Sequence, residues 1–356
     1  MQLLDVVDPR LLFENYVYVS GTSPSFVDHF RRYAEDIIKL LSLKPGDLVV
    51  DIGSNDGTLL RFFKQAGLRV LGIDPAKKIA EDATASGIPT LAEFFSPELA
   101  ETIISQHGKA SLVTANNMFA HADGLDAITT GISRLLKPRG AFVFEVSYLV
   151  DVYTKTLFDT IYHEHIAYHS VKPLISFFRK YGMEMTDAIR VPSHGGSLRG
   201  IARKTDAGPV TVNASLHAAV EEEERLGLDK QETLMAYGRQ IDERKSEVVS
   251  LLRKLKSEGK KIAGFGAPAK ATTLMYHFGL DRSVIDFIVD DSPLKQNLFT
   301  PGLHVPVLSA SAIKEKKPDY LIILAWNFAR PIIENNRDFK ASGGHFIIPL
   351  PTLEIQ

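Results

Sequence analysis

The feature that most constrains the fold is an alternation of strand and helix patterns in the first half of the chain. Its strand-like runs, apolar and rich in β-branched residues, lie at 47–53, 69–74, 111–116 and 140–146. Such an alternation predicts a parallel, doubly wound sheet covered by helices. A second alternation has its strand-like runs at 261–266, 284–291, 320–326 and 345–350. We therefore predict an α/β fold with two Rossmann-like doubly wound sheets.

The segments outside the alternations suggest how the chain is divided. A length of 356 residues suits about two domains. A helix is expected to begin near Ser23-Pro24, because proline favours the first helical turn. The predicted parts are an arm and helix at 1–45, the first sheet with a site-bearing middle segment at 46–215, one or two exposed linker helices at 216–259, and the second sheet at 260–356.

Composition excludes several classes of function. The chain has 41 Lys and Arg residues against 43 Asp and Glu residues, so no overall field favours nucleic acid or an anionic membrane, and we expect neither partner. The absence of cysteine excludes disulfides, thiolate nucleophiles and cysteine-ligated zinc. No apolar run reaches the ~18 to 20 residues of a membrane span and no signal pattern opens the chain, so the expected location is the cytoplasm.

The first strand–helix junction carries a glycine loop. Asp51 ends the strand pattern, and Gly53 and Gly57 follow with three residues between them. Backbone N–H groups at such a junction can face a nucleotide-type cofactor. Asp74 ends the next strand pattern, where a carboxylate can accept both ribose hydroxyls. The spacing departs from G-x-G-x-x-G and favours S-adenosylmethionine over NAD, while the alternative is a tight turn with Asp74 as a helix cap.

The predicted cofactor contacts extend to the end of the run at 111–116. Asparagines there fall at the carboxyl edge where open α/β sheets bind ligands, although asparagine is also a common turn residue. The predicted cofactor-binding residues are Asp51, Gly53, Ser54, Asn55, Gly57, Asp74, Asn116 and Asn117.

A histidine-rich segment lies further along the chain. Three of the eleven histidines, at 163, 165 and 169, fall within seven residues. Tyr162 and Glu164 lie beside them. Imidazole titrates near neutral pH, and a neighbouring carboxylate and phenol can tune it, so the segment suits a general base. Metal binding and a structural role are alternatives, but no second ligand cluster with evident spacing supports a metal.

Two further features are weaker by themselves. His121 falls five residues after Asn116, near the same edge, but a lone histidine is more often structural. The stretch 193–199 supplies His194, Gly195 and Arg199, which suit contact with an anion, although by themselves a bulged turn explains them better.

A second glycine loop opens the C-terminal alternation. Gly264, Gly266 and Ala267 follow a strand pattern and match G-x-G-x-x-A when Ala269 is counted. Lys270 adds a cation at the start of the following helix, which implies phosphate or pyrophosphate more securely than NAD. Asp290 ends the next strand pattern. The alternative is again a tight turn.

Taken together, several segments resemble the nucleotide-sugar C-methyltransferases, which add branching methyl groups to deoxysugars such as mycarose and tetronitrose. The segments are NYVYVSGTSPSFVDHF, DIGSNDGTLL, NMFAHAD, IYHEH, SHGGSLRG, GFGAPAK and DDSPLKQ…TPGLHVPV. The resemblance covers essentially the whole chain, and the ordered set is far more specific than any one segment. It implies that the first Rossmann domain binds S-adenosylmethionine and that the second helps to bind a dTDP-linked 4-keto-6-deoxy sugar.

The resemblance also implies roles for individual residues. His165 is the expected base, with Tyr162 and Glu164 beside it, and His121 and Tyr16 correspond to further active-site positions. A carbon next to a ketone is only weakly acidic, so a base must remove its proton while hydrogen-bond donors stabilise the enolate. The predicted substrate-binding residues are His163, His194, Gly195, Arg199, Gly264, Gly266, Ala267, Lys270 and Asp290.

Members of that family usually begin with a small zinc domain built on cysteine ligands, which this cysteine-free chain lacks, and no metal is expected. Three other functions stay open: methyl transfer to oxygen or nitrogen of a related small molecule, an NAD(P)-dependent oxidoreductase that uses the second glycine loop, and a non-catalytic relative. The oligomeric state also stays open, and a monomer is compatible with the missing domain.

Overall fold

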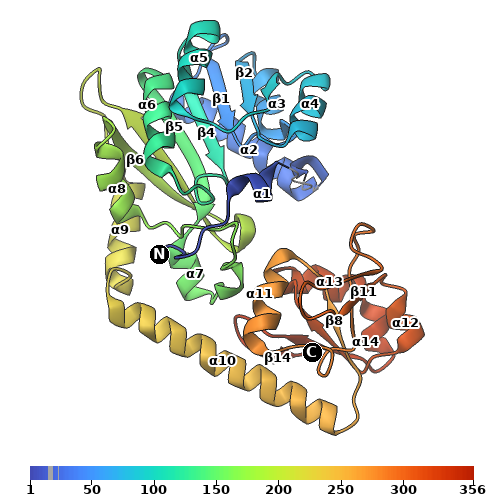
Figure 1. Ribbon diagram of the computed structural model, residues 1–356. Coiled ribbons are helices and arrows are strands. Elements are labelled where there is room, and N and C mark those ends of the chain that lie inside the picture. The colour runs from blue at the N-terminus through green and yellow to red at the C-terminus, as the bar shows by residue number, and fades with distance from the viewer. Residues whose placement is uncertain (15–18, 23) are drawn as a thin grey trace. The chain divides into compact units, whose positions relative to one another are not determined.

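The computed structural model describes residues 1–14, 19–22 and 24–356 and separates into two compact units (Figure 1). Unit 1 comprises Met1–Val150 and His163–Asp229, and unit 2 comprises Asp151–Tyr162 and Lys230–Gln356. The short stretch Asp151–Tyr162 therefore belongs with the C-terminal half of the chain, although both of its flanks belong to unit 1.

Unit 1 is built on a seven-stranded sheet in the order β3-β2-β1-β4-β5-β7-β6. Its strands are β1 (Leu48–Ile52), β2 (Arg69–Ile73), β3 (Thr90–Leu91), β4 (Ala110–Asn116), β5 (Leu136–Ser147), β6 (Met183–Val191) and β7 (Ser197–Lys204). Neighbouring strands run parallel except that β7 is antiparallel to both β5 and β6. The strand order reverses between β1 and β4, which is where open α/β sheets bind their ligands.

Helices pack on this sheet (Figure 1). They are α2 (Pro24–Leu41), α3 (Thr58–Gln65), α4 (Lys77–Ala85), α5 (Pro97–His107), α6 (Leu125–Leu135), α8 (Val171–Arg179) and α9 (Ala214–Leu226), whereas the short helix α1 (Pro9–Phe13) buries no residue. A further helix, α7 (Leu149–Thr154), carries the chain from unit 1 into unit 2. Short 3-10 turns form at η1 (Ser20–Thr22) and η3 (Ser193–Gly195).

One face of the sheet is covered by α2, whose buried residues recur every three or four positions, as an amphipathic helix requires. They are Phe30, Tyr33, Ala34 and Ile37. They belong to one core cluster with Val49, Leu112 and Val143 of β1, β4 and β5. The strand β1 itself is buried along its whole length, which explains its uninterrupted apolar sequence.

The opposite face of the sheet carries an aromatic core. Phe142 and Phe144 alternate with Val143 along β5, so their rings lie on the other side. The ring of Phe119, in the loop after β4, lies 5.4 Å from each of them, and Phe178 of α8 stacks on Phe119 at 5.9 Å. These contacts fix the start of the loop that continues to His121.

Unit 2 has a seven-stranded sheet in the order β10-β11-β9-β8-β12-β13-β14. Its strands are β8 (Ile262–Phe265), β9 (Phe287–Val289), β10 (Leu298–Phe299), β11 (Pro306–Leu308), β12 (Tyr320–Ile323), β13 (His345–Ile348) and β14 (Glu354–Ile355). The five inner strands are parallel, and the two edge strands pair antiparallel. The strand order reverses between β8 and β12.

The helices of unit 2 begin with one long helix (Figure 1). They are α10 (Gln231–Ser257), α11 (Ala269–Phe278), α12 (Ala312–Lys316), α13 (Ala329–Asn335) and α14 (Arg337–Ala341). The short turns η2 (Phe158–Thr160) and η4 (Trp326–Phe328) complete the unit.

The predicted fold class is confirmed, because each strand-like run of both alternations corresponds to a strand of one of the two sheets. The charged stretch 216–259 forms two helices, since Gly227 ends α9 in a left-handed conformation. The two units divide the chain differently from the predicted domains, because α9 lies in unit 1, α10 in unit 2, and Asp151–Tyr162 in unit 2. The short edge strands and the antiparallel pair β6–β7 have no counterpart in the prediction.

Among the helices of the described residues, none is long and apolar enough to cross a membrane.

Candidate active site

The first glycine loop connects β1 to α3 at the carboxyl edge of the sheet. Gly53 and Gly57 have φ angles of 76° and 74°, in the left-handed region that favours glycine. A Cβ at Gly53 would lie 3.0 Å from the Cβ of Met118, in the loop after β4. The N–H groups of Gly53 and Ser54 donate to the Ile73 carbonyl at 2.8 and 3.1 Å, which ties the loop to β2.

Asp74 lies at the end of β2, beside this loop. One carboxylate oxygen accepts the Asn55 N–H at 2.8 Å, and the other accepts the Ala76 N–H at 2.9 Å. Burial raises the pKa of Asp74, and the two N–H donors oppose that rise. A carboxylate offers about four acceptor positions, so two remain for ligand hydroxyl groups. Asp74 thus serves the loop as a cap and keeps the capacity to bind a ribose.

Further contacts fix the loop and the strand end before it. Ser54 is buried, and the Asn55 side chain accepts the Ser20 N–H at 2.9 Å. Asp51 is only 3% exposed and accepts a 2.6 Å hydrogen bond from the Thr114 hydroxyl. Burial raises the pKa of Asp51 to about 7. Its carboxyl group therefore lies inside the sheet, and direct contact with a cofactor stays a prediction.

The end of β4 presents an amide group that needs a partner. Both side-chain polar atoms of Asn116 are buried without a well-formed hydrogen bond, and the equally buried Tyr33 hydroxyl lies close enough to interact with them. Asn117, with a φ of 53°, donates its N–H to the Glu145 carbonyl at 2.8 Å. Buried polar atoms without well-formed hydrogen bonds are unfavourable, so a polar ligand at the switch point would stabilise Asn116. Together with Asp74, this amide fits the donor and acceptor groups of S-adenosylmethionine.

A buried polar network that the sequence prediction missed lies at the end of β5. Glu145 accepts hydrogen bonds from Arg199 of β7 at 2.7 Å and from His29 of α2 at 2.8 Å. Burial raises the pKa of Glu145, but the His29 hydrogen bond and the Arg199 charge hold it below its usual value. The Arg199 guanidinium also lies 4.3 Å from the Tyr33 ring centroid. A glutamate inside an apolar strand pattern was the signal that could have revealed this network.

The Arg199 side chain is occupied by this network. Its side chain is only 7% exposed and is engaged by Glu145, so the contact with a substrate anion stays a prediction. The neighbouring Gly195 has a φ of 91° in the turn η3. The side chain of His194 lies outside what the structure describes.

The structure brings two of the predicted catalytic histidines together. The rings of His121 and His165 lie 5.0 Å apart, and Phe13 of α1 stacks on His121 at 5.9 Å. The Ala167 N–H donates to the Ala120 carbonyl at 3.0 Å, which joins the segment after His165 to the loop after β4. Two histidines far apart in sequence thus share one site in unit 1.

The other predicted catalytic residues surround His165 in sequence. Tyr162 and Glu164 are half-buried, whereas His163 is exposed. Tyr162 is the last residue of the stretch that belongs to unit 2, and His163 is the first that belongs again to unit 1. Tyr16 lies outside the described residues. Within the described residues, no three His, Asp or Glu side chains are gathered as a metal ion would require.

The second glycine loop, after β8, is packed against its neighbours. Gly266 has a φ of 86°, and a Cβ there would lie 2.7 Å from the Ala325 Cβ after β12. A Cβ at Gly264 would lie 2.9 Å from the Ile288 side chain. The Gly266 N–H donates to the Val289 carbonyl at 2.7 Å. The packing of the two sheet neighbours is sufficient to explain both glycines.

The charged residues of this loop also have internal partners. The Ala267 N–H donates to Asp290 at 2.7 Å, and Lys295 lies 3.5 Å from the same carboxylate. Lys270 Nζ lies 3.3 Å from Asp159. Contacts of Ala267, Lys270 and Asp290 with a substrate therefore stay predictions.

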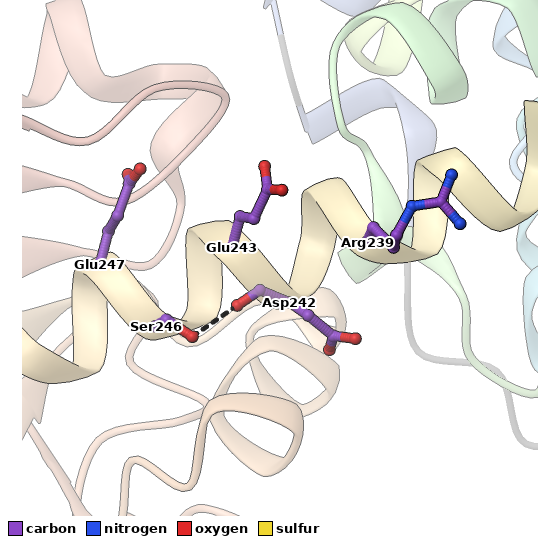
Figure 2. Close-up of a pocket in the computed structure, with 5 residues that line it drawn as sticks. All are labelled: Arg239, Asp242, Glu243, Ser246 and Glu247. Carbon is purple, nitrogen blue, oxygen red and sulfur yellow. Dashed lines mark hydrogen bonds between the residues drawn. The ribbon is translucent and has the colours of Figure 1, made fainter.

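Two of the hollows among the described residues lie in unit 2. One, of about 240 Å³, lies between the start of α11 and the β10–β11 strands and is lined by apolar residues including Pro268, Met275 and Phe299. The other runs along α10, where Figure 2 shows charged and polar side chains such as Arg239 and Glu243. Every residue that lines the second hollow comes from this one helix, so it provides no enclosed binding site.

Each half of the chain matches a known protein family. Residues 26–188 match the family described as a methyltransferase domain, and residues 192–351 match the C-methyltransferase C-terminal domain. The chain is 36% identical over 351 residues to the C-methyltransferase NovU of Streptomyces niveus, covering 99% of this chain and 83% of that protein.

Solved structures were also compared. The chain is similar to magnesium protoporphyrin IX methyltransferase (ChlM) from Synechocystis PCC 6803 with bound SAH, with a TM-score of 0.40, 17% identity, and coverage of 50% of this chain and 84% of that chain. It is also similar to a SAM-dependent methyltransferase from Archaeoglobus fulgidus, with a TM-score of 0.41, 14% identity, and coverage of 50% and 94%.

The matched methyltransferase domain includes the first glycine loop, Asp74 and the end of β4, and the protein is an enzyme of the S-adenosylmethionine-dependent methyltransferase class. Its cofactor is S-adenosylmethionine, and its methyl acceptor is a carbon atom. The identity to NovU extends along nearly the whole sequence, so the chain belongs to the nucleotide-sugar C-methyltransferase family.

Proposed function

We propose that this enzyme methylates a carbon next to the ketone of a nucleotide-linked 4-keto-6-deoxy sugar, with dTDP as the nucleotide. The observation that supports it most is the pair of histidine rings, His121 and His165, 5.0 Å apart and connected to the loop after β4. Asn116, at the end of that strand, has buried polar atoms without a well-formed hydrogen bond at the cofactor side of the same edge. A base and a cofactor site thus share one edge of the sheet.

The chemistry assigns separate tasks to the residues. His165 would remove the proton from the carbon next to the ketone, because imidazole can accept a proton near neutral pH. His121, beside it, would donate a hydrogen bond to the enolate oxygen, where negative charge develops. Tyr162 and Glu164 would orient the base and the sugar. When bound, S-adenosylmethionine supplies an electrophilic methyl group on its sulfonium.

The residues that would hold the cofactor are in place before it binds. The glycine loop after β1 is tied to β2, Asp74 retains acceptor positions for ribose hydroxyls, and Asn116 can pair with polar groups at the switch point. A preorganised site requires little rearrangement when the cofactor binds.

The nucleotide is assigned to unit 2, as the resemblance of the second Rossmann domain implies. The apolar hollow of about 240 Å³ beside Pro268 and Phe299 supports a place for a planar base. We further propose that the enzyme acts in the cytoplasm on this small-molecule substrate.

The test is incubation with methyl-labelled S-adenosylmethionine and a dTDP-4-keto-6-deoxy sugar, followed by NMR of the product. We expect the label on the carbon next to the ketone, which loses the proton that the base removes. Without S-adenosylmethionine, that proton should exchange for deuterium in deuterated water. Label on oxygen or nitrogen would replace the proposal with methyl transfer to a heteroatom. No transfer of label to this sugar by enzyme that binds S-adenosylhomocysteine would overturn the proposed substrate class.

A further inference from the structure

Three side chains from separate segments of unit 2 meet at one point. Asp159 comes from η2, Lys270 from the first turn of α11, and Trp326 from η4. Trp326 Nε1 donates a hydrogen bond of 2.6 Å to Asp159 Oδ2, and Lys270 Nζ lies 3.3 Å from the same oxygen. The ammonium group also lies 4.1 Å from the centroid of the Trp326 ring. These three residues are called the anchor cluster.

The anchor cluster is buried. The Asp159 side chain has no exposed surface, and that of Lys270 is 13% exposed. Burial raises the pKa of Asp159, while the charge of Lys270 opposes that rise, and burial lowers the pKa of Lys270. An unpaired charge at this depth is strongly unfavourable, so each charged group depends on the other.

The anchor cluster lies at the carboxyl ends of β8 and β12. Lys270 follows β8 and Trp326 follows β12, and the strand order reverses between these two strands. Ligands of doubly wound sheets bind at such a switch point. In this protein the carboxylate of Asp159, from the stretch Asp151–Tyr162, lies there instead.

Other contacts dock the same stretch on α11. The Thr273 hydroxyl donates to the Ile161 carbonyl at 3.2 Å. The Phe158 ring lies 5.5 Å from that of Phe278 and 5.4 Å from that of His277. The residues directly before Tyr162 are therefore fixed by both polar and aromatic contacts.

We propose that the anchor cluster positions the stretch Asp151–Tyr162 for catalysis, with Asp159 and Lys270 as positioning residues. Tyr162 follows Asp159 by three residues, and the histidine segment continues directly to His165. Holding Asp159 therefore restricts where the backbone enters this segment. The inference rests on the proposed function, because the catalytic roles of Tyr162 and His165 are part of it.

This role differs from the phosphate contact that the place of Lys270 at the start of a helix suggests. A lysine that binds only a diphosphate needs no internal carboxylate, and a carboxylate 3.3 Å away would repel the incoming anion. Lys270 acts on the reaction through Asp159 and the stretch that Asp159 belongs to.

The first experiment needs no substrate. Hydrogen exchange of residues 151–162 is measured in the wild type, Asp159→Asn, Lys270→Met and the double variant. Asparagine keeps an acceptor for the Trp326 N–H and removes only the charge. We expect faster exchange in both single variants, and exchange near that of the wild type in the double variant, where no charge is left unpaired. Wild-type exchange in both single variants would overturn the proposal.

A matched control exists in the same unit. Lys256 pairs with Asp286 at 2.9 Å, and Lys256→Met should leave the exchange of residues 151–162 unchanged. Trp326, the only tryptophan of the chain, reports on the cluster directly. Its emission should change in Lys270→Met and not in Lys256→Met. Unchanged emission in Lys270→Met would show that the ammonium group does not face the indole in solution.

Kinetics with the nucleotide sugar then separates positioning from binding. For Lys270→Met we expect kcat to fall about tenfold or more with KM within about twofold, and the double variant to recover most of kcat. A rise in KM that the double variant does not reverse would instead make Lys270 a phosphate ligand. If the wild type transfers no methyl to carbon, the proposed function fails, while exchange and emission still decide whether the stretch is anchored.

Discussion

The two glycine loops of this protein occupy equivalent places and differ in what surrounds them. Each follows the first strand of its sheet, each contains a glycine with positive φ, and each has an aspartate at the end of the next strand. Around the first loop, Asn116 has buried polar atoms without a well-formed hydrogen bond at the switch point. At the second switch point, Asp159 Oδ2 already pairs with Lys270, while the buried Oδ1 of the same carboxylate has no hydrogen-bond partner among the described residues. Glycine spacing therefore indicates a sharp turn, and only the surroundings distinguish a ligand site from a packed one.

The largest expected effect concerns the base beside the first sheet. His165→Asn should lower turnover by roughly 10²-fold or more, the usual contribution of a general base, and should leave cofactor affinity nearly unchanged. Steady-state kinetics and calorimetry measure the two quantities. His217→Asn, on the exposed surface of α9, is the control. Unchanged turnover in His165→Asn would remove this residue from the role of base.

The next effect compares the two strand-end aspartates. Asp74→Ala should weaken S-adenosylhomocysteine binding by about tenfold or more, because hydrogen bonds to a charged group contribute about 1.5–3 kcal/mol each. Asp290→Ala, at the equivalent place in unit 2, should leave that affinity unchanged. Calorimetric titration of both variants tests the difference. Normal affinity in Asp74→Ala would leave that carboxylate only its role as a cap.

A third pair of variants compares the glycines themselves. Gly53→Ala and Gly266→Ala both place a Cβ in the left-handed region, at a cost of about 1–2 kcal/mol in the free energy of unfolding. Gly53→Ala should also weaken cofactor binding. Gly266→Ala should destabilise the protein without that loss, because its Cβ would meet Ala325 and the second loop is not part of the proposed cofactor site. Denaturant unfolding and calorimetry measure both effects, and equal loss of cofactor affinity would contradict the contrast between the loops.

The last comparison concerns the pH dependence of stability that Asp51, in the strand before the first loop, contributes. Burial raises the pKa of Asp51 to about 7. Between pH ~4 and ~7 the folded state holds a proton that the unfolded state releases, so this contribution is present below pH ~4 and is lost as the pH rises. Asp51→Asn should therefore gain stability relative to the wild type by about 1 kcal/mol per pH unit across that range. Urea unfolding at several pH values measures it, and parallel curves would contradict it.

Local sequence patterns were sufficient to predict the main elements of both sheets. Buried parallel strands require short uninterrupted apolar runs, and each such run became a strand. The short strands β3, β10, β11 and β14 escaped prediction because two or three residues carry no periodicity. The antiparallel pair β6–β7 escaped because its polar residues, such as Arg199, gave the sequence the character of a loop.

Some residues of the candidate site could also be predicted from the sequence, and others could not. The glycine loop and Asp74 could be identified because turn geometry and strand-end position are local properties. The pairing of His29 with Glu145, 116 residues apart, could not, because hydrogen-bond partners at that separation leave no trace in a local pattern. The approach of His121 to His165 likewise depends on how the loop after β4 folds back on the histidine segment.

The sequence by itself determined the fold class, the two glycine loops and the histidine segment, because periodicity and turn chemistry act over a few neighbouring residues. Only the tertiary structure decided that Lys270, beside the second loop, pairs with a carboxylate of its own chain. Asp159 and Trp326, 167 residues apart, meet Lys270 because the stretch Asp151–Tyr162 packs with the C-terminal half. The buried Lys270 requires a partner of opposite charge, and the packing of distant segments brings Asp159 to that position.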